Sequence, residues 1–251
     1  MASQGGNNGE NHHGPMEQFD INPLVKLNVN GYDISYTNSA LFMTLAIVCT
    51  LGFFLFTTYK RSIVPNRAQA IGELIFEFVA NMVKENVGQK GMKYFPFIFT
   101  LFLFILFGNV LGLLPYSFTF TSHIIVNAAL AVFIFVAVTI IGFAAHGLGY
   151  LRLFCPNGTP LLVAIVLVPI EIMSYFIRPV SLSLRLFANM LAGHVLLKVL
   201  AGFVISLGVF GLVPFIAISA VTLLEIMVAL IQAYVFALLS TIYLNDAINL
   251  H

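Results

Sequence analysis

LLVAIVLVPIEIMSYFIRPVSLSLRLFANMLAGHVLLKVLAGFVISL, residues 161–207, is a mostly apolar segment that is too long to cross a membrane upright. As one helix it would measure about 70 Å at 1.5 Å per residue, against a hydrocarbon core about 30 Å thick. Two upright crossings would need a turn inside the segment, and Arg178-Pro179 is the only candidate. We therefore expect one long, strongly tilted helix with a kink at Pro179.

A second apolar segment, residues 212–244, has the same property. It would measure about 50 Å as a helix and contains no internal turn signal. Residues 208–214 join the two segments, which predicts an antiparallel hairpin of two tilted helices. Tilt beyond the usual range of about 0–40° needs a cause, and a curved partner surface alongside would supply one.

The composition identifies an integral membrane protein. Of 251 residues, 60% are hydrophobic and only 8% are charged, whereas soluble domains contain about 25% charged residues. The formal net charge of +1 and the absence of a basic arm argue against a nucleic-acid partner. Cys49 and Cys155 lack metal-ligand spacing, and no Gly-Lys dipeptide or catalytic motif occurs. We therefore expect no catalytic site, no cofactor and no metal on this chain.

The remaining apolar segments complete an all-α architecture. We expect spans at about 39–59, 95–114 and 123–145, followed by tilted helices at about 161–207 and 212–244. Residues 66–93 carry apolar side chains at helical spacing, which predicts an amphipathic helix in the membrane interface, or one docked on a partner. Residues 1–36 are then a tail and pre-span segment, and residues 37–251 form a single transmembrane domain of five crossing helices and one interfacial helix.

The distribution of basic residues predicts the orientation of the chain in the membrane. The connection between the first two spans carries Lys60, Arg61, Arg67, Lys84, Lys90 and Lys93. Basic connections stay on the cytoplasmic or matrix side. We therefore expect the N-terminus outside and the C-terminus inside.

Polar side chains form one stripe along the 161–207 helix, where steps of three and four residues relate Ser174, Arg178, Ser181, Arg185 and Asn189. An Arg at mid-depth costs about 2.5–3.5 kcal/mol on insertion scales, so Arg185 indicates an ion path or a partner charge. Its guanidinium cannot pass a proton on. Glu171 lies on the same side about 21 Å further inward; it either lines an inner aqueous pocket or snorkels to the interface.

The last helix brings a second set of polar residues to the first. Glu225 and Gln232 are seven residues apart, hence on one face. An antiparallel hairpin brings Glu225 and His194 together in the outer half, as a proton-exchanging pair or a structural hydrogen bond. Gln232 comes level with Arg185. Further polar residues could line the pockets or bond across helices, namely Asn109, His123, Asn127 and Ser181.

Three sequence stretches carry a resemblance to a known family. SLSLRLFANMLAGH at 181–194, LEIMVALIQAYVFALLSTIYLNDAINLH at 224–251 and NVLGLLPYSFTFTSH at 109–123 resemble subunit a of the F-type ATP synthases. The resemblance covers nearly the whole chain after the tail. PMEQFDI at 15–21 and the C-terminal YLNDAINLH at 243–251 are similar to the corresponding stretches of alphaproteobacterial and mitochondrial members. This similarity implies a location in the bacterial inner membrane, or alternatively in the mitochondrial inner membrane.

The resemblance also implies a role. The chain would be a non-catalytic, proton-translocating stator subunit of the ATP synthase complex, which abuts a ring of c subunits and the peripheral stalk subunit b in the lipid bilayer. Arg185 matches the arginine that faces the ring carboxylate, and Asn189 and Gln232 match its neighbours. His194 and Glu225 match the outer half-channel pair, and Glu171 matches an inner half-channel carboxylate.

Two other classes of function compete with this interpretation. A stand-alone proton-coupled secondary transporter is the main alternative, but such proteins fold as repeats, and no internal repeat is visible in the sequence. A purely structural membrane scaffold would not need Arg185 at mid-depth.

Overall fold

The computed structural model describes residues 23–25, 28–29, 32–33, 35–59, 65–114, 118–147, 149–150 and 161–249. Within these ranges, five helices are long and apolar enough to cross a membrane, namely α1 (Asn38–Thr58), α3 (Phe95–Gly112), α4 (Ile124–His146), α5 (Leu161–Ser206) and α6 (Leu212–Ile248). The prediction of an all-α membrane protein with five crossing helices is confirmed. Of the predicted tail and pre-span segment at 1–36, residues 1–22, 26–27, 30–31 and 34 lie outside the described residues.

Short strands before the first helix were not predicted from the sequence. β1 (Pro23–Val25) pairs antiparallel with β4 (Tyr36–Thr37), and β2 (Asn28–Val29) pairs antiparallel with β3 (Tyr32–Asp33). Thr37 ends β4 and starts α1, because its side-chain oxygen accepts a hydrogen bond from the Ala40 amide at 3.4 Å. These strands therefore lead the chain into the first span.

The predicted amphipathic helix at 66–93 is shorter than expected. α2 spans Arg67–Val87 and is followed by the 3-10 helix η2 (Gln89–Tyr94). Gly88 separates them at φ 78°, a left-handed conformation that glycine adopts without steric penalty, and its amide bonds the Lys84 carbonyl. Val79, Met82, Val83 and Val87 form the buried face of α2, which contacts α1, α3 and α6.

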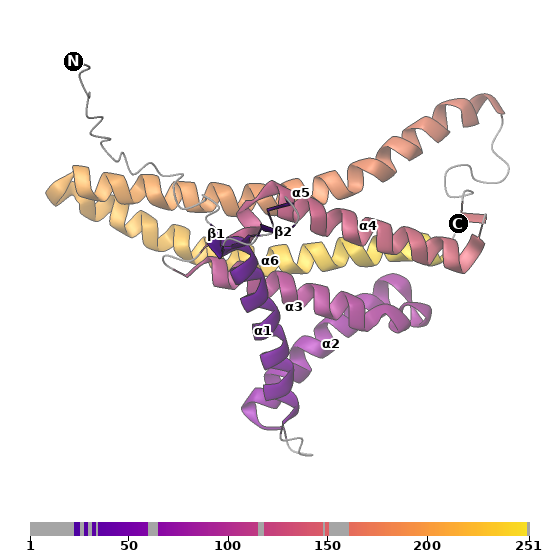
Figure 1. Ribbon diagram of the computed structural model, residues 1–251, viewed down its shortest axis with the longest axis horizontal. Coiled ribbons are helices and arrows are strands. Elements are labelled where there is room, and N and C mark those ends of the chain that lie inside the picture. The colour runs from indigo at the N-terminus through magenta and orange to yellow at the C-terminus, as the bar shows by residue number, and fades with distance from the viewer. Residues whose placement is uncertain are drawn as a thin grey trace.

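Four of the long helices, α3 to α6, run roughly along one direction, and α1 crosses them (Figure 1). In Figure 1, α1 runs at a steep angle to α3, α4, α5 and α6. Contacts join α5 to α6, α3 to α6, and α4 to both α5 and α6. Phe236 and Ala237 of α6 are fully buried against this group, together with Leu103 of α3, Ile134 of α4 and Leu186 of α5. α6 is therefore the central helix of the domain.

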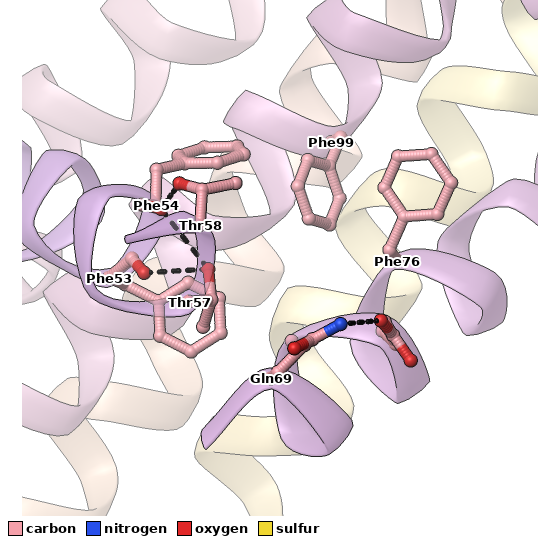
Figure 2. A pocket seen from close by; sticks show the side chains of 9 residues that line it. Phe53, Phe54, Thr57, Thr58, Gln69, Phe76 and Phe99 are labelled. Atoms are coloured by element: carbon pink, nitrogen blue, oxygen red, sulfur yellow. Dashed lines mark hydrogen bonds between the residues drawn. The ribbon is translucent and has the colours of Figure 1, made fainter. Parts of the chain in front are cut away.

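α1 and α2 meet around a pocket of about 300 Å³ that is lined by phenylalanines (Figure 2). Phe54 and Phe99 pack edge to face at 5.3 Å between ring centroids. A Cβ added to Gly72 of α2 would lie 2.8 Å from Cβ of Thr57 on α1, so glycine permits the close approach of these two helices.

The predicted hairpin of two long helices is present. α5 has 46 residues and α6 has 37, or about 69 Å and 55 Å at 1.5 Å per residue. The 3-10 helix η5 (Gly208–Gly211) joins them, and Gly208 has φ 55°. Figure 1 shows that the turn of the hairpin projects beyond α3 and α4, and that α5 bends along its length. Pro169 and Pro179 inside α5 remove backbone donors, which accounts for bending.

Candidate functional site

His194 of α5 is buried at the hairpin side of the domain, where it meets the connection between α3 and α4. Its Nε2 lies 3.1 Å from Oγ1 of Thr119, and only 9% of the residue is exposed. Thr119 directly precedes the 3-10 helix η3 (Phe120–Ser122), and its hydroxyl also donates to the carbonyl of Gly112 at 3.0 Å. The last residue of α3, the α3–α4 connection and α5 are thereby joined through one hydroxyl.

Glu225 of α6 lies against α5 beside this histidine. A Cβ added to Gly193 would lie 3.0 Å from Cδ of Glu225, and closer still to its Oε1. Gly193 therefore leaves the space that the carboxyl group occupies, and the next residue in the chain is His194. The Glu225 residue is 8% exposed. The structure thus places the Glu225 carboxyl group against Gly193, the residue that precedes His194 in the chain.

The amides of Asn189 and Gln232 join α5 to α6 one turn from Arg185. Asn189 Nδ2 donates to Gln232 Oε1 at 3.0 Å. Asn109 of α3 approaches the same stretch of α6, because its Nδ2 donates to the Ala229 carbonyl at 3.3 Å. Within the described ranges, Gln232 Nε2 and Asn109 Oδ1 are buried without a hydrogen-bond partner. The side-chain amides around this part of α6 therefore have hydrogen-bonding atoms without a partner among the described residues.

The two arginines of α5 have different surroundings. Arg178 Nη1 lies 2.7 Å from Asp246 Oδ2 near the end of α6. Its guanidinium also lies over the rings of Tyr175 and Tyr243, at 5.9 Å and 5.2 Å from their centroids. Arg185 is half-buried and, among the residues that the structure describes, makes no ion pair or hydrogen bond. Arg178 thus has a counter-charge among the described residues, and Arg185 has none there.

The predicted polar stripe lies on a partly exposed face of α5. Ser174, Ser181 and Asn189 are exposed, and Arg178 and Arg185 are half-buried between them. The stripe is therefore accessible to a neighbouring surface. Glu171, further along the same helix, is half-buried and has no hydrogen bond or ion pair to the described residues. The structure does not bring Glu171 to His194 and Glu225.

His123 and Asn127 lie around the η3 turn. Asn127 is buried, and its Nδ2 donates to the Thr121 carbonyl at 2.6 Å, which gives it a structural contact. The His123 ring stacks on Phe118 at 5.0 Å between centroids. Burial lowers the pKa of His123, which precedes the first residue of α4, so its neutral form is favoured. Both residues contribute to the connection that carries Thr119.

Sequence reasoning missed three residues of this arrangement. Thr119 lies in the connection between two predicted spans, and its partner His194 is 75 residues away. Asp246 lay beyond the predicted end of the last helix, whereas α6 continues to Ile248. Gly193 follows Ala192 on α5, and only the position of Glu225 shows why residue 193 is glycine. Each contact depends on packing between distant segments.

Comparisons with known proteins show the family of the chain. The family model described as ATP synthase A chain matches residues 40–245. A protein of Rhodospirillum rubrum named ATP synthase subunit a is 60% identical over 240 residues, which covers 95% of this chain and 100% of that protein. Proteins of the same name from Paramagnetospirillum magneticum and Mesorhizobium japonicum are 54% and 52% identical, and cover 94% of this chain and 99% and 96% of their own lengths. The chain belongs to the ATP synthase A chain family.

Proposed function

We propose that the chain is the proton-translocating stator subunit of the membrane sector of a rotary F-type ATP synthase, in which Arg185 faces the ionisable carboxylate of a rotor ring of c subunits. The observation that carries the proposal is the difference between the two arginines of α5. Arg178 is paired with Asp246, whereas Arg185 has no acidic partner in the described chain.

A membrane arginine without an internal partner is stabilised by a negative charge from outside the chain. An unpaired guanidinium at mid-depth costs several kcal/mol, and an opposite charge within about 4–6 Å offsets part of that cost. Arg185 lies on a partly exposed face of α5, between the exposed residues Ser181 and Asn189. A carboxylate on a passing rotor subunit fits both the charge and the position.

The two proton pathways would lie on opposite sides of Arg185. On the hairpin side, His194 and Glu225 would hand an incoming proton to the rotor carboxylate, with Asn109 and Gln232 as polar neighbours. The neutral rotor site can turn into lipid, because a carboxylic acid is far less costly to bury than a carboxylate. After nearly a full turn, it would release its proton into the inner pathway near Glu171.

Arg185 would perform two tasks in this cycle. It attracts the deprotonated rotor carboxylate and so favours proton release on the inner side. It also keeps the two pathways separate, since a guanidinium does not give up its proton. Each proton that crosses 100 mV supplies about 2.3 kcal/mol, so several protons are needed for each ATP that the catalytic subunits make.

The proposal includes the setting of the chain. It would be integral to the bacterial inner membrane, with the N-terminus outside and the C-terminus inside, and would itself be non-catalytic. The peripheral stalk subunit b would hold it against the ring. The exposed apolar side chains Ile71 and Leu74 of α2 are available to such a partner or to lipid.

Replacement of Arg185 by Ala in the assembled complex tests the proposal. In liposomes with an imposed proton gradient, Arg185→Ala is expected to abolish ATP synthesis, whereas Lys84→Ala, at an exposed position of α2, should not change it. Full proton-driven synthesis in the Arg185→Ala complex would refute the stator role. Loss of synthesis in both variants would point to a general effect of removing a positive charge.

A further inference from the structure

Thr119 lies between two polar atoms that compete for its single hydroxyl proton. Its Oγ1 is 3.0 Å from the Gly112 carbonyl oxygen and 3.1 Å from Nε2 of His194. The residue is 1% exposed. The Thr119 hydroxyl is therefore shielded from solvent, and it makes its hydrogen bonds to protein atoms.

The proton on each atom follows from the chemistry of the three groups. A carbonyl oxygen only accepts, so the hydroxyl proton of Thr119 points to Gly112. Gly112 is the last residue of α3, and the final carbonyls of a helix accept no hydrogen bond from an amide of the same helix. The hydroxyl oxygen is then an acceptor toward His194, and Nε2 of the ring must carry the hydrogen.

We propose that Thr119 is a positioning residue that holds neutral His194 in the tautomer with hydrogen on Nε2, so that the transported proton arrives at and leaves from Nδ1. The inference rests on the proposed path through His194. In balanced form, the neutral ring takes a proton on Nδ1 and becomes imidazolium. The imidazolium then passes that proton from Nδ1 toward the Glu225 carboxylate, which becomes a carboxylic acid. The Nε2 hydrogen stays in place.

The surroundings hold Thr119 in its position. A Cβ added to Gly112 would lie 2.6 Å from Cγ2 and 2.9 Å from Oγ1 of Thr119, so glycine is required for the two to approach. The carbonyl of Thr119 also accepts a hydrogen bond from Ser122 Oγ at 2.6 Å, which closes the η3 turn. The acceptor for His194 is thus fixed before any proton arrives.

The ring orientation of a histidine commonly depends on the bond that its other nitrogen makes. Thr119→Val keeps the shape of the side chain and removes the oxygen, whereas Thr119→Ser keeps the hydroxyl. Thr121→Val is the control, because it removes a hydroxyl of the same turn whose oxygen has no hydrogen-bond partner among the described residues. Gly112→Ala displaces Thr119 from the opposite side and serves as a second disruption.

The experiment measures nitrogen-15 shifts of His194 in the assembled complex in lipid, together with proton-driven ATP synthesis. These shifts separate protonated from unprotonated ring nitrogens. Wild type, Thr119→Ser and Thr121→Val are expected to show hydrogen on Nε2 in the neutral ring and similar synthesis. Thr119→Val and Gly112→Ala should show mixed tautomers and about tenfold slower synthesis, the equivalent of one lost hydrogen bond.

An unchanged Nε2 hydrogen in both Thr119→Val and Gly112→Ala would overturn the assignment. A mixed tautomer with undiminished synthesis would overturn the relay role, and it would also show that the proton path of the proposed function does not pass through His194. Failure of Thr119→Ser to retain wild-type synthesis would likewise contradict the inference, because that variant keeps the acceptor.

Discussion

Gly193→Ala should obstruct the proposed proton path by displacing the Glu225 carboxyl group. The added Cβ would lie 3.0 Å from Cδ and 3.1 Å from Cγ of Glu225. Non-bonded carbons prefer a separation of about 3.5–4.0 Å, so the carboxyl group must move by about 0.5–1 Å or the helices must part. Overpacking of this kind costs about 1–3 kcal/mol.

The expected functional effect is larger than the effect on stability. Misplacement of a reacting group by about 1 Å can slow a reaction about 100-fold. We expect Gly193→Ala to lower the rate of proton-driven ATP synthesis about 10- to 100-fold in liposomes that contain the assembled complex. Catalysis of ATP hydrolysis by the detached soluble subunits should not change, because they do not contact this site.

Gly202→Ala is the matched control on the same helix. An added Cβ there meets no atom within 4 Å, and replacing glycine with alanine favours a helix by about 0.5–1 kcal/mol. It should leave synthesis unchanged. Glu225→Asp shortens the side chain by one methylene, so adding it to Gly193→Ala should recover part of the lost rate. Wild-type synthesis in Gly193→Ala would refute the close packing of the carboxyl group and its role.

Two further predictions concern stability. A double-mutant cycle of Arg178→Met and Asp246→Asn, measured by thermal unfolding, should give a coupling of about 0.5–1 kcal/mol, since the side chains are 25% and 29% exposed and solvent screens the pair; additive effects would show that the pair is not stabilising. Gly72→Ala should destabilise the α1–α2 contact by about 1–3 kcal/mol through overlap with Thr57, and Thr57→Ala should reverse most of the loss; an undisturbed melting temperature in the single variant would contradict the packing.

The lengths and polar spacings of the last two helices could be predicted from the sequence, because hydrophobic length and helical periodicity are local properties. The hairpin of α5 and α6 followed from segments too long to stand upright. The meeting of Glu225 and the His194 region followed from counting residues from a shared turn. The end of α2 could also be predicted, since Gly88 is a typical helix terminator. The predicted helix at 66–93 was too long because it continued past this glycine.

Other features depend on contacts between segments far apart in the chain. The pairing of Arg178 with Asp246 joins residues 68 positions apart and requires α6 to continue past the predicted end. The contact of Thr119 with His194 requires a particular fold of the short α3–α4 connection. Neither leaves a periodic signal, so side-chain packing had to be seen before these residues could be assigned a role.

The most direct measurement is a density map of the assembled membrane sector that resolves the side chains of α5. We predict that Arg185 lies within about 4–6 Å of an acidic side chain of a neighbouring rotor subunit, at a range where opposite charges interact strongly. Arg178 should remain on Asp246. An Arg185 that points into lipid, or that pairs with a carboxylate of its own chain, would contradict the account.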